Sequence, residues 1–276
     1  MGNTNLFFKK IVQFILKWLA KIYLWRIKPK VIVIAGTTGR HWIKEAVAEA
    51  LEEKNFSVRT NRKNFNAEIG LPLSILGLPS GNASFLGWLK ILWQAIVKII
   101  TNYQLPITDY LVLEMAIDAP ENMNYLMSIV KPNAVILTTI TMTHPENFEN
   151  LDEISREYGE LAKSLPWNGI LILNNDDLRI RELSKYFDGK IITFGFSDGS
   201  RYKAVNVRKI TDGQMFKVET RRKEKEILDI KINRFGQHHI YAELIKAIIK
   251  DNFKERQKDF FGKIFPPRAD QPLAGK

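Results

Sequence analysis

A short loop with two glycines, GTTGR at residues 36–40, is the part of this sequence that best suits the binding of an anion. It follows an apolar, β-branched run from Val31 to Ala35, which predicts a buried parallel strand, and a helical stretch begins near Trp42. In such a strand–turn–helix unit, the backbone amides of the loop and the positive end of the helix face one point, which favours a phosphate group. Two glycines at this spacing are a weak signal alone, but their place between a strand and a helix strengthens the prediction.

Polar residues with metal-binding or hydrogen-bonding chemistry follow the later apolar runs; they are Glu114, His144, Asn174, Asp176 and Asp177. A carboxylate such as Glu114 is a hard oxygen ligand that suits magnesium, and His144 could supply a nitrogen ligand or orient a bound water. Taken singly, the same residues also fit ordinary roles: a solvated carboxylate at a strand end, a turn histidine, and a turn or helix cap.

The elements that would position these residues alternate between strands and helices. Apolar runs predict further strands at 110–113, 134–137, 169–173 and 190–193, and helical patterns fall at 119–129 and 151–165. From residue 202 to residue 232, short alternating segments predict antiparallel strands, and a last helix is expected at 239–250. The fold class is therefore α/β: a mostly parallel sheet flanked by helices, with a small antiparallel section.

The first 30 residues form a basic and apolar segment. They carry +7 of the net charge of +11 and contain no acidic residue. The apolar stretch from Leu6 to Trp25 predicts an amphipathic helix with a narrow polar stripe, and its four lysines argue against a simple membrane span or a signal peptide. Residues 5–26 are expected either to lie in the interface of an anionic membrane or to pack on the domain or a partner. A second apolar helix at 84–100 leaves the same two alternatives open.

The composition excludes several kinds of site. The chain has no cysteine, so a disulfide, a thiolate metal site and a cysteine nucleophile are all excluded. Four histidines leave little material for a zinc cluster, which favours magnesium as the metal. Beyond residue 30 the chain is only mildly basic, so we expect no nucleic-acid partner.

Several segments, in order along the chain, resemble the Mur ligase family, ATP-dependent enzymes that add amino acids to cell-wall precursors. The loop and helix GTTGRHWIKE is similar to the family's phosphate loop and its following Lys-Glu pair, and the resemblance extends over residues 30–276. The other matching segments are NFNAEIGLPLSIL from residue 64, LVLEMAIDAPENMNYLMSIVKPNAVILT, THPENF, LPWNGILILNNDD, FGQHHIYAELIKAI and PPRADQPLAGK. The branch that adds D-alanyl-D-alanine is the most similar.

The resemblance implies a P-loop central domain that binds ATP and Mg²⁺. It implies that a carboxylate of a UDP-muramoyl peptide attacks the γ-phosphate, and that the resulting acyl phosphate is captured by a D-amino-acid dipeptide, in the cytoplasm or at the inner membrane face. The implied catalytic positions are Arg40, Lys44 and Tyr158, and the implied metal ligands are Glu114 and His144. Nucleotide contacts are implied for Gly36, Thr37, Thr38, Gly39, Arg40, His41, Asn174, Asp176, Asp177, His238 and Arg268, and substrate contacts for Asn64 and Asn66.

Departures from the family pattern fall at positions of chemical importance. Arg40 stands where the family has the phosphate-loop lysine, and a planar guanidinium does not replace a compact ammonium without consequence. His41 replaces a hydroxyl residue that binds magnesium, and Tyr158 replaces a lysine that becomes carbamylated. Thr139, His239 and Ala242 replace family asparagines. These changes leave a second reading open: a catalytically degenerate or truncated homologue that binds a nucleotide or precursor, or serves as a scaffold at a membrane surface.

The resemblance also predicts a domain organisation. Residues 1–29 would form the basic apolar helix, residues 30–265 the central ATP-binding domain, and residues 266–276 a hinge. We expect the N-terminal acceptor domain of the family to be replaced by the helix, and the C-terminal domain to be absent.

Overall fold

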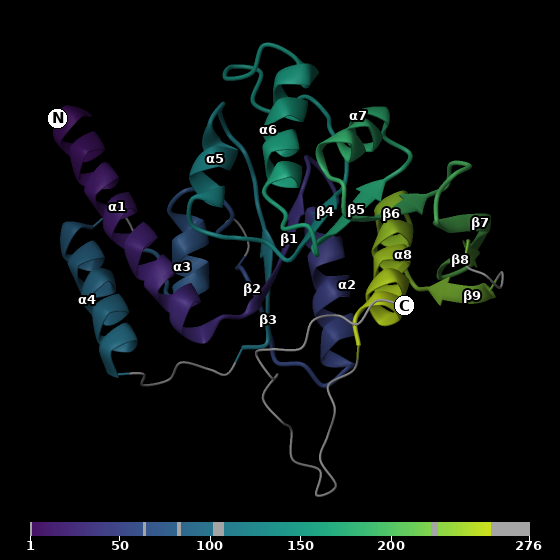
Figure 1. Ribbon diagram of the computed structural model, residues 1–276, viewed down its shortest axis with the longest axis horizontal. Coiled ribbons are helices and arrows are strands. Elements are labelled where there is room, and N and C mark those ends of the chain that lie inside the picture. Colours follow the sequence, from purple (N-terminus) through teal and green to yellow (C-terminus); the bar gives the residue numbers. More distant parts are fainter. Residues whose placement is uncertain (1, 63–64, 82–83, 102–107, 222–225, 255–276) are drawn as a thin grey trace, which may run out of the picture.

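The computed structural model describes residues 2–62, 65–81, 84–101, 108–221 and 226–254. The strands of this described part form one nine-stranded sheet in the order β2-β3-β1-β4-β5-β6-β7-β8-β9 (Figure 1). The parallel strands are β1 (Lys30–Ala35), β2 (Val58–Thr60), β3 (Tyr110–Glu114), β4 (Ala134–Leu137), β5 (Ile170–Asn174) and β6 (Lys190–Gly195). The predicted α/β class with a mostly parallel sheet is confirmed.

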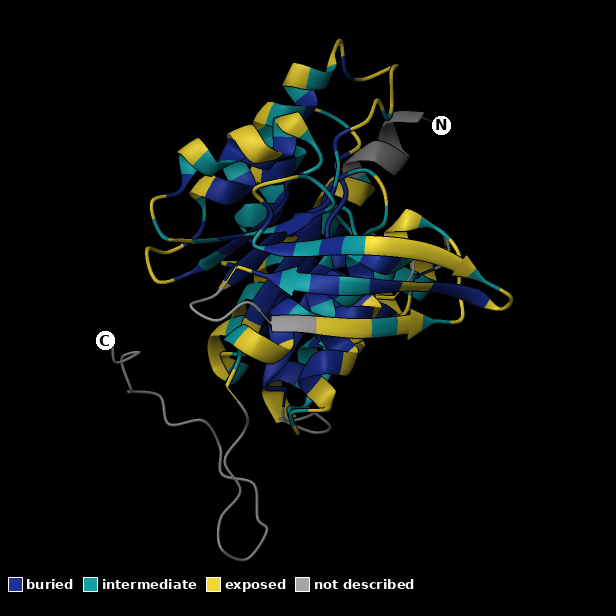
Figure 2. Cartoon of the chain, turned by 90° about the vertical axis from the view of Figure 1, so that its right-hand side faces the viewer, coloured by how far each residue is buried: buried dark blue, intermediate teal, exposed yellow. Residues whose placement is uncertain are grey.

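An antiparallel extension completes one side of the sheet. It consists of β7 (Tyr202–Ile210), β8 (Gly213–Thr220) and β9 (Glu226–Ile232), and β7 joins the parallel part by pairing in parallel with β6. A turn at Asp212-Gly213 connects β7 to β8, and Gly213 has a φ of 154°. In β7, the exposed residues gather toward the turn that leads into β8, at the projecting end of the strand (Figure 2).

Helices cover both faces of the parallel strands. One face carries α1 (Gly2–Ile27), α3 (Gly70–Leu76), α4 (Phe85–Thr101), α5 (Asn122–Met127), α6 (Leu151–Lys163) and α7 (Leu178–Glu182), with the 3₁₀ turn η1 (Leu183–Tyr186). The other face carries α2 (Arg40–Glu52) and α8 (Gln237–Asn252), which pack on each other. Successive strand residues therefore bury into opposite cores, Val33 into the first and Ile34 into the second. Burial on both faces explains why these strands read as uninterrupted apolar runs.

The N-terminal helix α1 is part of the first core rather than an appendage. Its residues Val12, Leu16, Ala20 and Tyr23 are buried in the same cluster as the strands. Arg59 of β2 links α1 to α3. The Arg59 guanidinium donates to Tyr23 Oη of α1 at 2.6 Å and to the carbonyl oxygens of Ser74 and Ile75 at the end of α3. The packing alternative is thus correct for one face of α1. The predicted domain boundaries at residues 29 and 265 stay predictions.

The strand order places a crevice at the loop of residues 36–40. From β1 the chain runs to β2 and then β3 on one side of β1, and it next forms β4 on the other side, so the strand order reverses beside β1. In open parallel sheets, ligands bind outside the carboxyl ends of the strands at such a reversal.

None of the helices in the described ranges combines the length and apolar composition needed to cross a membrane.

Two neighbouring residues on α1 test whether this helix contributes to the stability of the domain. Leu16 is fully buried and Phe14 is exposed. We expect Leu16→Ala to lower the free energy of unfolding by about 2–5 kcal/mol through the cavity that it leaves. Phe14→Ala, the matched control, should change it by less than about 0.5 kcal/mol. Urea denaturation followed by circular dichroism measures both, and equal small effects would show that α1 folds apart from the sheet.

Candidate functional site

The loop of residues 36–39 is held against the end of β4 by backbone and hydroxyl contacts. Thr37 N donates to Thr139 O at 2.8 Å, and Thr138 Oγ1 donates to Thr38 O at 2.8 Å. The hydroxyls of Thr38 and Thr139 are also hydrogen-bonded, with 2.7 Å between their oxygens. Thr139 therefore helps to fix the loop.

The two glycines of the loop meet different requirements. Gly36 has a φ of 125°, and a Cβ there would lie 2.2 Å from Thr138 Oγ1, so both backbone and space demand glycine. Gly39 has a φ of 78° and is the N-cap of α2, but a Cβ there would meet only His238 Cβ at 3.9 Å. The first glycine brings the loop close to β4, and the second turns the chain into α2.

The start of α2 presents unsatisfied backbone amides at the crevice. No side chain caps this helix, and the Ile43 amide donates to Gly39 O at 3.3 Å as the first helical hydrogen bond. The amides of Arg40, His41 and Trp42 precede it, and a helix offers them no acceptor. Together with the helix dipole they suit an anion.

Glu114, the last residue of β3, lies beside this loop and is surrounded by donors. Its Oε1 accepts from Arg40 Nε at 3.2 Å and from Asn66 Nδ2 at 3.1 Å, while its Oε2 lies 3.9 Å from Lys44 Nζ. The backbone of Glu114 is fixed by Asn61, whose amide side chain bonds both Glu114 N and Glu114 O at 2.9 Å. The structure thus brings together four of the residues implied by the resemblance: Arg40, Lys44, Asn66 and Glu114.

Tyr158 of α6 belongs to the same cluster, where its phenol contacts Gly36 and Arg40. Its side chain is buried, and burial raises the pKa of the phenol to about 12, although the Arg40 charge and hydrogen bonds with Gly36 and Arg40 oppose the shift. The phenol is therefore neutral at physiological pH. A neutral phenol supplies neither the charge nor the two oxygens of a carbamate.

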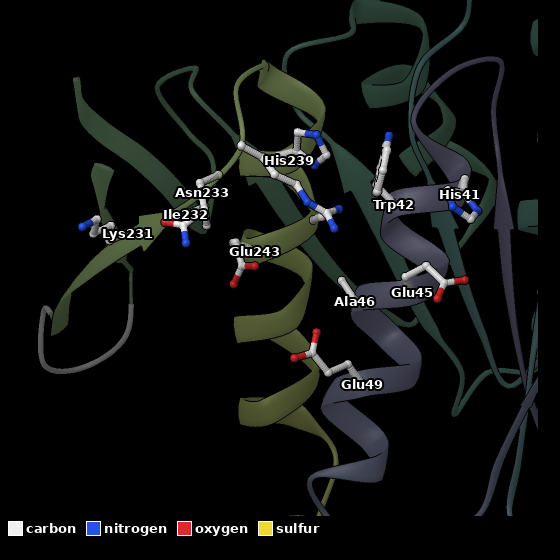
Figure 3. Close-up of a pocket in the computed structure, with 12 residues that line it drawn as sticks. His41, Trp42, Glu45, Ala46, Glu49, Lys231, Ile232, Asn233, His239 and Glu243 are labelled. Atoms are coloured by element: carbon white, nitrogen blue, oxygen red, sulfur yellow. The ribbon is translucent and has the colours of Figure 1, made fainter. Parts of the chain in front are cut away.

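A groove of about 560 Å³ opens beside the loop, between α2, α8 and the end of β9 (Figure 3). At one end, Trp42 stacks on His238 with ring centroids 6.0 Å apart. The Arg234 guanidinium lies over the Trp42 ring, 4.7 Å from its centroid. Further along the two helices, Glu49 of α2 and Glu243 of α8 face the groove. Burial raises the pKa of Glu243. Burial, aided by the charges of His238 and Arg234, lowers the pKa of His239.

The Asn174-x-Asp-Asp segment is engaged with protein donors. Asp177 caps α7 by accepting from Ile180 N, and its other oxygen accepts from Ile140 N at 2.7 Å. Asp176 accepts from the amides of Phe196 and Ser197 and from Tyr241 Oη. The carboxylates therefore hold loops together, as the cap reading of these residues predicts. A role of Asn174, Asp176 and Asp177 toward a nucleotide stays a prediction.

His144 lies on an exposed turn and has a φ of 52°. Its contacts are with residues other than those around Glu114. Its ring nitrogens face Glu146 Oε1 at 3.1 Å and Asp118 Oδ1 at 3.5 Å. Asn64 and Arg268, implied as substrate and nucleotide contacts, lie outside the described residues. Sequence reasoning missed Asn61, Trp42 and Arg234; Asn61 follows a strand of only three residues, too short to show an apolar pattern.

The residues present do not fit a divalent cation held by the protein. A hard cation needs free oxygen ligands, and the Glu114 carboxylate is already shared by Arg40, Asn66 and Lys44. Tyr158 adds only a neutral phenol. Across the described ranges, no group of three or more His, Asp or Glu side chains is placed to hold a metal.

Comparisons with known proteins agree on one family and one fold. Residues 97–248 match the sequence model of the Mur ligase middle domain. UDP-N-acetylmuramoyl-tripeptide–D-alanyl-D-alanine ligase of Haemophilus influenzae is 22% identical over 267 residues, covering 91% of this chain and 50% of that protein. The ligase of the same name from Buchnera aphidicola is 26% identical over 235 residues, covering 84% of this chain and 45% of that protein. The chain thus spans about half the length of the curated relatives it matches.

Solved structures share the fold over most of the chain. MurF ligase of Thermotoga maritima, in complex with ADP, gives a TM-score of 0.68 at 21% identity and covers 90% of this chain and 50% of its own. MurF of Acinetobacter baumannii gives a TM-score of 0.66 at 18% identity, covering 85% of this chain and 45% of its own.

The two loop glycines give a matched test of the loop geometry. We expect Gly36→Ala to lower the free energy of unfolding by about 3–5 kcal/mol, because strain and a steric clash with Thr138 add together. Gly39→Ala meets only the left-handed backbone penalty of about 1–2 kcal/mol. Thermal and urea unfolding of both variants measure the difference. Equal losses would contradict the close approach of the loop to β4.

Proposed function

The chain belongs to the Mur ligase middle domain family, and from this premise we propose that it binds ATP or ADP through the loop of residues 36–40. The observation that carries the proposal is the uncapped start of α2, whose free amides lie at the sheet crevice where strand order reverses. The structural neighbour from Thermotoga maritima was solved with ADP, which supports the choice of ligand. The groove beside Trp42 and His239 offers space next to the loop for the rest of a nucleotide.

We further propose a place in peptidoglycan precursor synthesis. The curated relatives are named as ligases that join UDP-N-acetylmuramoyl-tripeptide and D-alanyl-D-alanine, so a UDP-muramoyl peptide and a D-amino-acid dipeptide are the substrates to test. In such a reaction this chain's own contribution is positional: the α2 amides and the cations Arg40 and Lys44 hold phosphate oxygens in line for attack. The side chains of the site do not suit Mg²⁺, so the positioning proposed for this chain relies on its own amides and cations.

A second candidate is a nucleotide-binding or scaffold protein without ligase activity. Two observations favour it: the Arg40–Glu114 pair in the phosphate loop, and the neutral Tyr158 phenol at the carbamate position. The two candidates differ in one assay. A ligase releases inorganic phosphate from ATP only when the UDP-muramoyl peptide and the dipeptide are both present. A scaffold releases none under the same conditions, although it binds ADP.

Nucleotide binding itself predicts thermal stabilisation. Free ADP at about a hundredfold excess over its Kd should stabilise the folded state by about 2.7 kcal/mol, seen as a rise in Tm. Adenosine, which lacks phosphates, is the matched control and should give a much smaller rise, because the loop contacts phosphate. Absence of any shift with ADP, or an equal shift with adenosine, contradicts the proposal.

We also propose that the chain associates with an anionic membrane surface through α1 and α4. Each helix exposes an apolar stripe: Ile11, Phe14, Trp18, Ile22 and Trp25 on α1, and Phe85, Leu86, Leu89, Trp93, Val97 and Ile100 on α4. The helices lie side by side at one edge of the molecule (Figure 1), and their N-terminal ends meet at the Phe8 and Phe85 rings, 5.0 Å apart. Neither helix contains an acidic residue, and both carry lysines.

The charge on these helices decides between a membrane and a second copy of the chain. Pairing two copies through this surface would bring the two sets of lysines together, which is unfavourable. An anionic lipid surface instead attracts the lysines while the tryptophans enter the interface. For the exposed faces of both helices we therefore propose the membrane alternative.

Sedimentation with vesicles tests this surface. The protein should bind vesicles containing anionic phosphatidylglycerol and bind zwitterionic phosphatidylcholine vesicles much more weakly. The double variant Trp18→Ala/Trp93→Ala should bind at least about tenfold more weakly, since burying each aromatic side chain is worth about 1.5–3 kcal/mol. Trp167→Ala, at an exposed tryptophan outside the two helices, is the control and should bind like the wild type. Equal binding by the double variant and the control excludes the surface.

A further inference from the structure

The Arg40 guanidinium is held from two sides inside the phosphate loop. Its Nη1 donates to Gly36 O, directly after β1, and its Nε donates to Glu114 Oε1 at 3.2 Å, at the end of β3. The side chain is 19% exposed, so it fills the loop rather than extending into solvent. One planar fork therefore joins the carboxyl ends of two adjacent strands, a geometry that a single ammonium does not reproduce.

Glu114 is the anion that bonds Arg40, and it faces two cations. Its side chain is 13% exposed, with Arg40 on Oε1 and Lys44 near Oε2. Lys44 is almost fully buried, and its ammonium donates to Asn61 O at 3.0 Å. Tyr158 contributes no charge, because its phenol is neutral. Arg40, Lys44 and Glu114 together carry a formal charge of +1 before any ligand binds. A second carboxylate, Glu45, lies 3.9 Å from Lys44 Nζ, but its side chain is 57% exposed, so water screens its charge.

This charge balance works against a divalent cation and for an anion. A cation bound to Glu114 would lie next to two fixed positive charges, and it would have to displace Arg40 from its carboxylate partner. A phosphate group at the α2 amides instead meets a net positive cluster with no metal present. The positive charge that phosphate binding requires is already part of the chain.

We infer that Arg40 is a built-in counter-charge that takes the neutralising place of a protein-held divalent cation, so that ADP binds at this loop independently of magnesium. The inference rests on the proposed nucleotide site and adds to it how the phosphate charge is neutralised. It also assigns Glu114 the role of orienting Arg40 rather than that of binding a metal.

Calorimetric titration of the full chain with ADP, in excess magnesium chloride and in excess EDTA, tests the inference. The two Kd values are expected to agree within about twofold. Binding that is more than about tenfold weaker in EDTA overturns the inference while leaving the nucleotide site intact. Absence of binding in both buffers overturns the proposed function, and the inference with it.

Arg40→Lys separates the guanidinium from simple charge. The lysine cannot bridge Gly36 O and Glu114 together, so ADP binding in EDTA should weaken by about tenfold and recover in part when magnesium is added. Arg181→Lys, at an exposed arginine of α7, is the matched control and should bind ADP like the wild type in both buffers. Circular dichroism confirms that each variant is folded. Unchanged binding by Arg40→Lys in EDTA contradicts the inference.

Metal binding in the absence of nucleotide tests whether Glu114 is a metal ligand. Electron paramagnetic resonance of added Mn²⁺ should show the same amount of bound ion for the wild type and for Glu114→Gln, because the carboxylate is occupied by Arg40. If the wild type binds one more Mn²⁺ than Glu114→Gln, the carboxylate is a metal ligand and the inference fails.

Discussion

The contact between Arg40 and Glu114 depends on one constraint, the parallel pairing of β1 with β3. In parallel strands the carboxyl ends meet at one edge of the sheet, and the register pairs Ile34 with Glu114 just before the phosphate loop begins. The residue that opens α2 therefore faces the residue that ends β3, although 74 positions separate them in the chain. Close approach of Gly36 to β4 fixes the other side of the loop. The position of the α2 amides and the Arg40–Glu114 ion pair both follow from this arrangement.

The same ion pair decides how the charges of this site are arranged. Relatives and solved structures share the fold over most of the chain. In this chain the Glu114 carboxylate orients Arg40, and the neutral phenol of Tyr158 adds no anion. A nucleotide site can persist under these conditions because helix amides and fixed cations bind phosphate without a metal.

Much of the fold could be predicted from sequence because the central strands are buried on both faces and read as apolar runs. Three-residue β2 and short α3 carry no such period, and the structure adds them. The loop glycines were predictable from their place between a strand and a helix. The Arg40–Glu114 contact and the Asn61 bonds depend on strand order, which no local pattern reveals. Helix α1 was ambiguous for a physical reason: one face packs in the core and the other, around Trp18, is exposed, so both readings shared the same apolar residues.

The central claim is that a nucleotide phosphate and the Arg40–Glu114 pair coexist without a metal between them. A crystal structure of the ADP complex grown in manganese chloride, with anomalous scattering recorded at the manganese edge, tests this most directly. The account predicts a phosphate on the α2 amides, Arg40 still on Glu114, and no anomalous peak within ligand distance of the carboxylate. A manganese ion bound to Glu114, with Arg40 turned away, would contradict it.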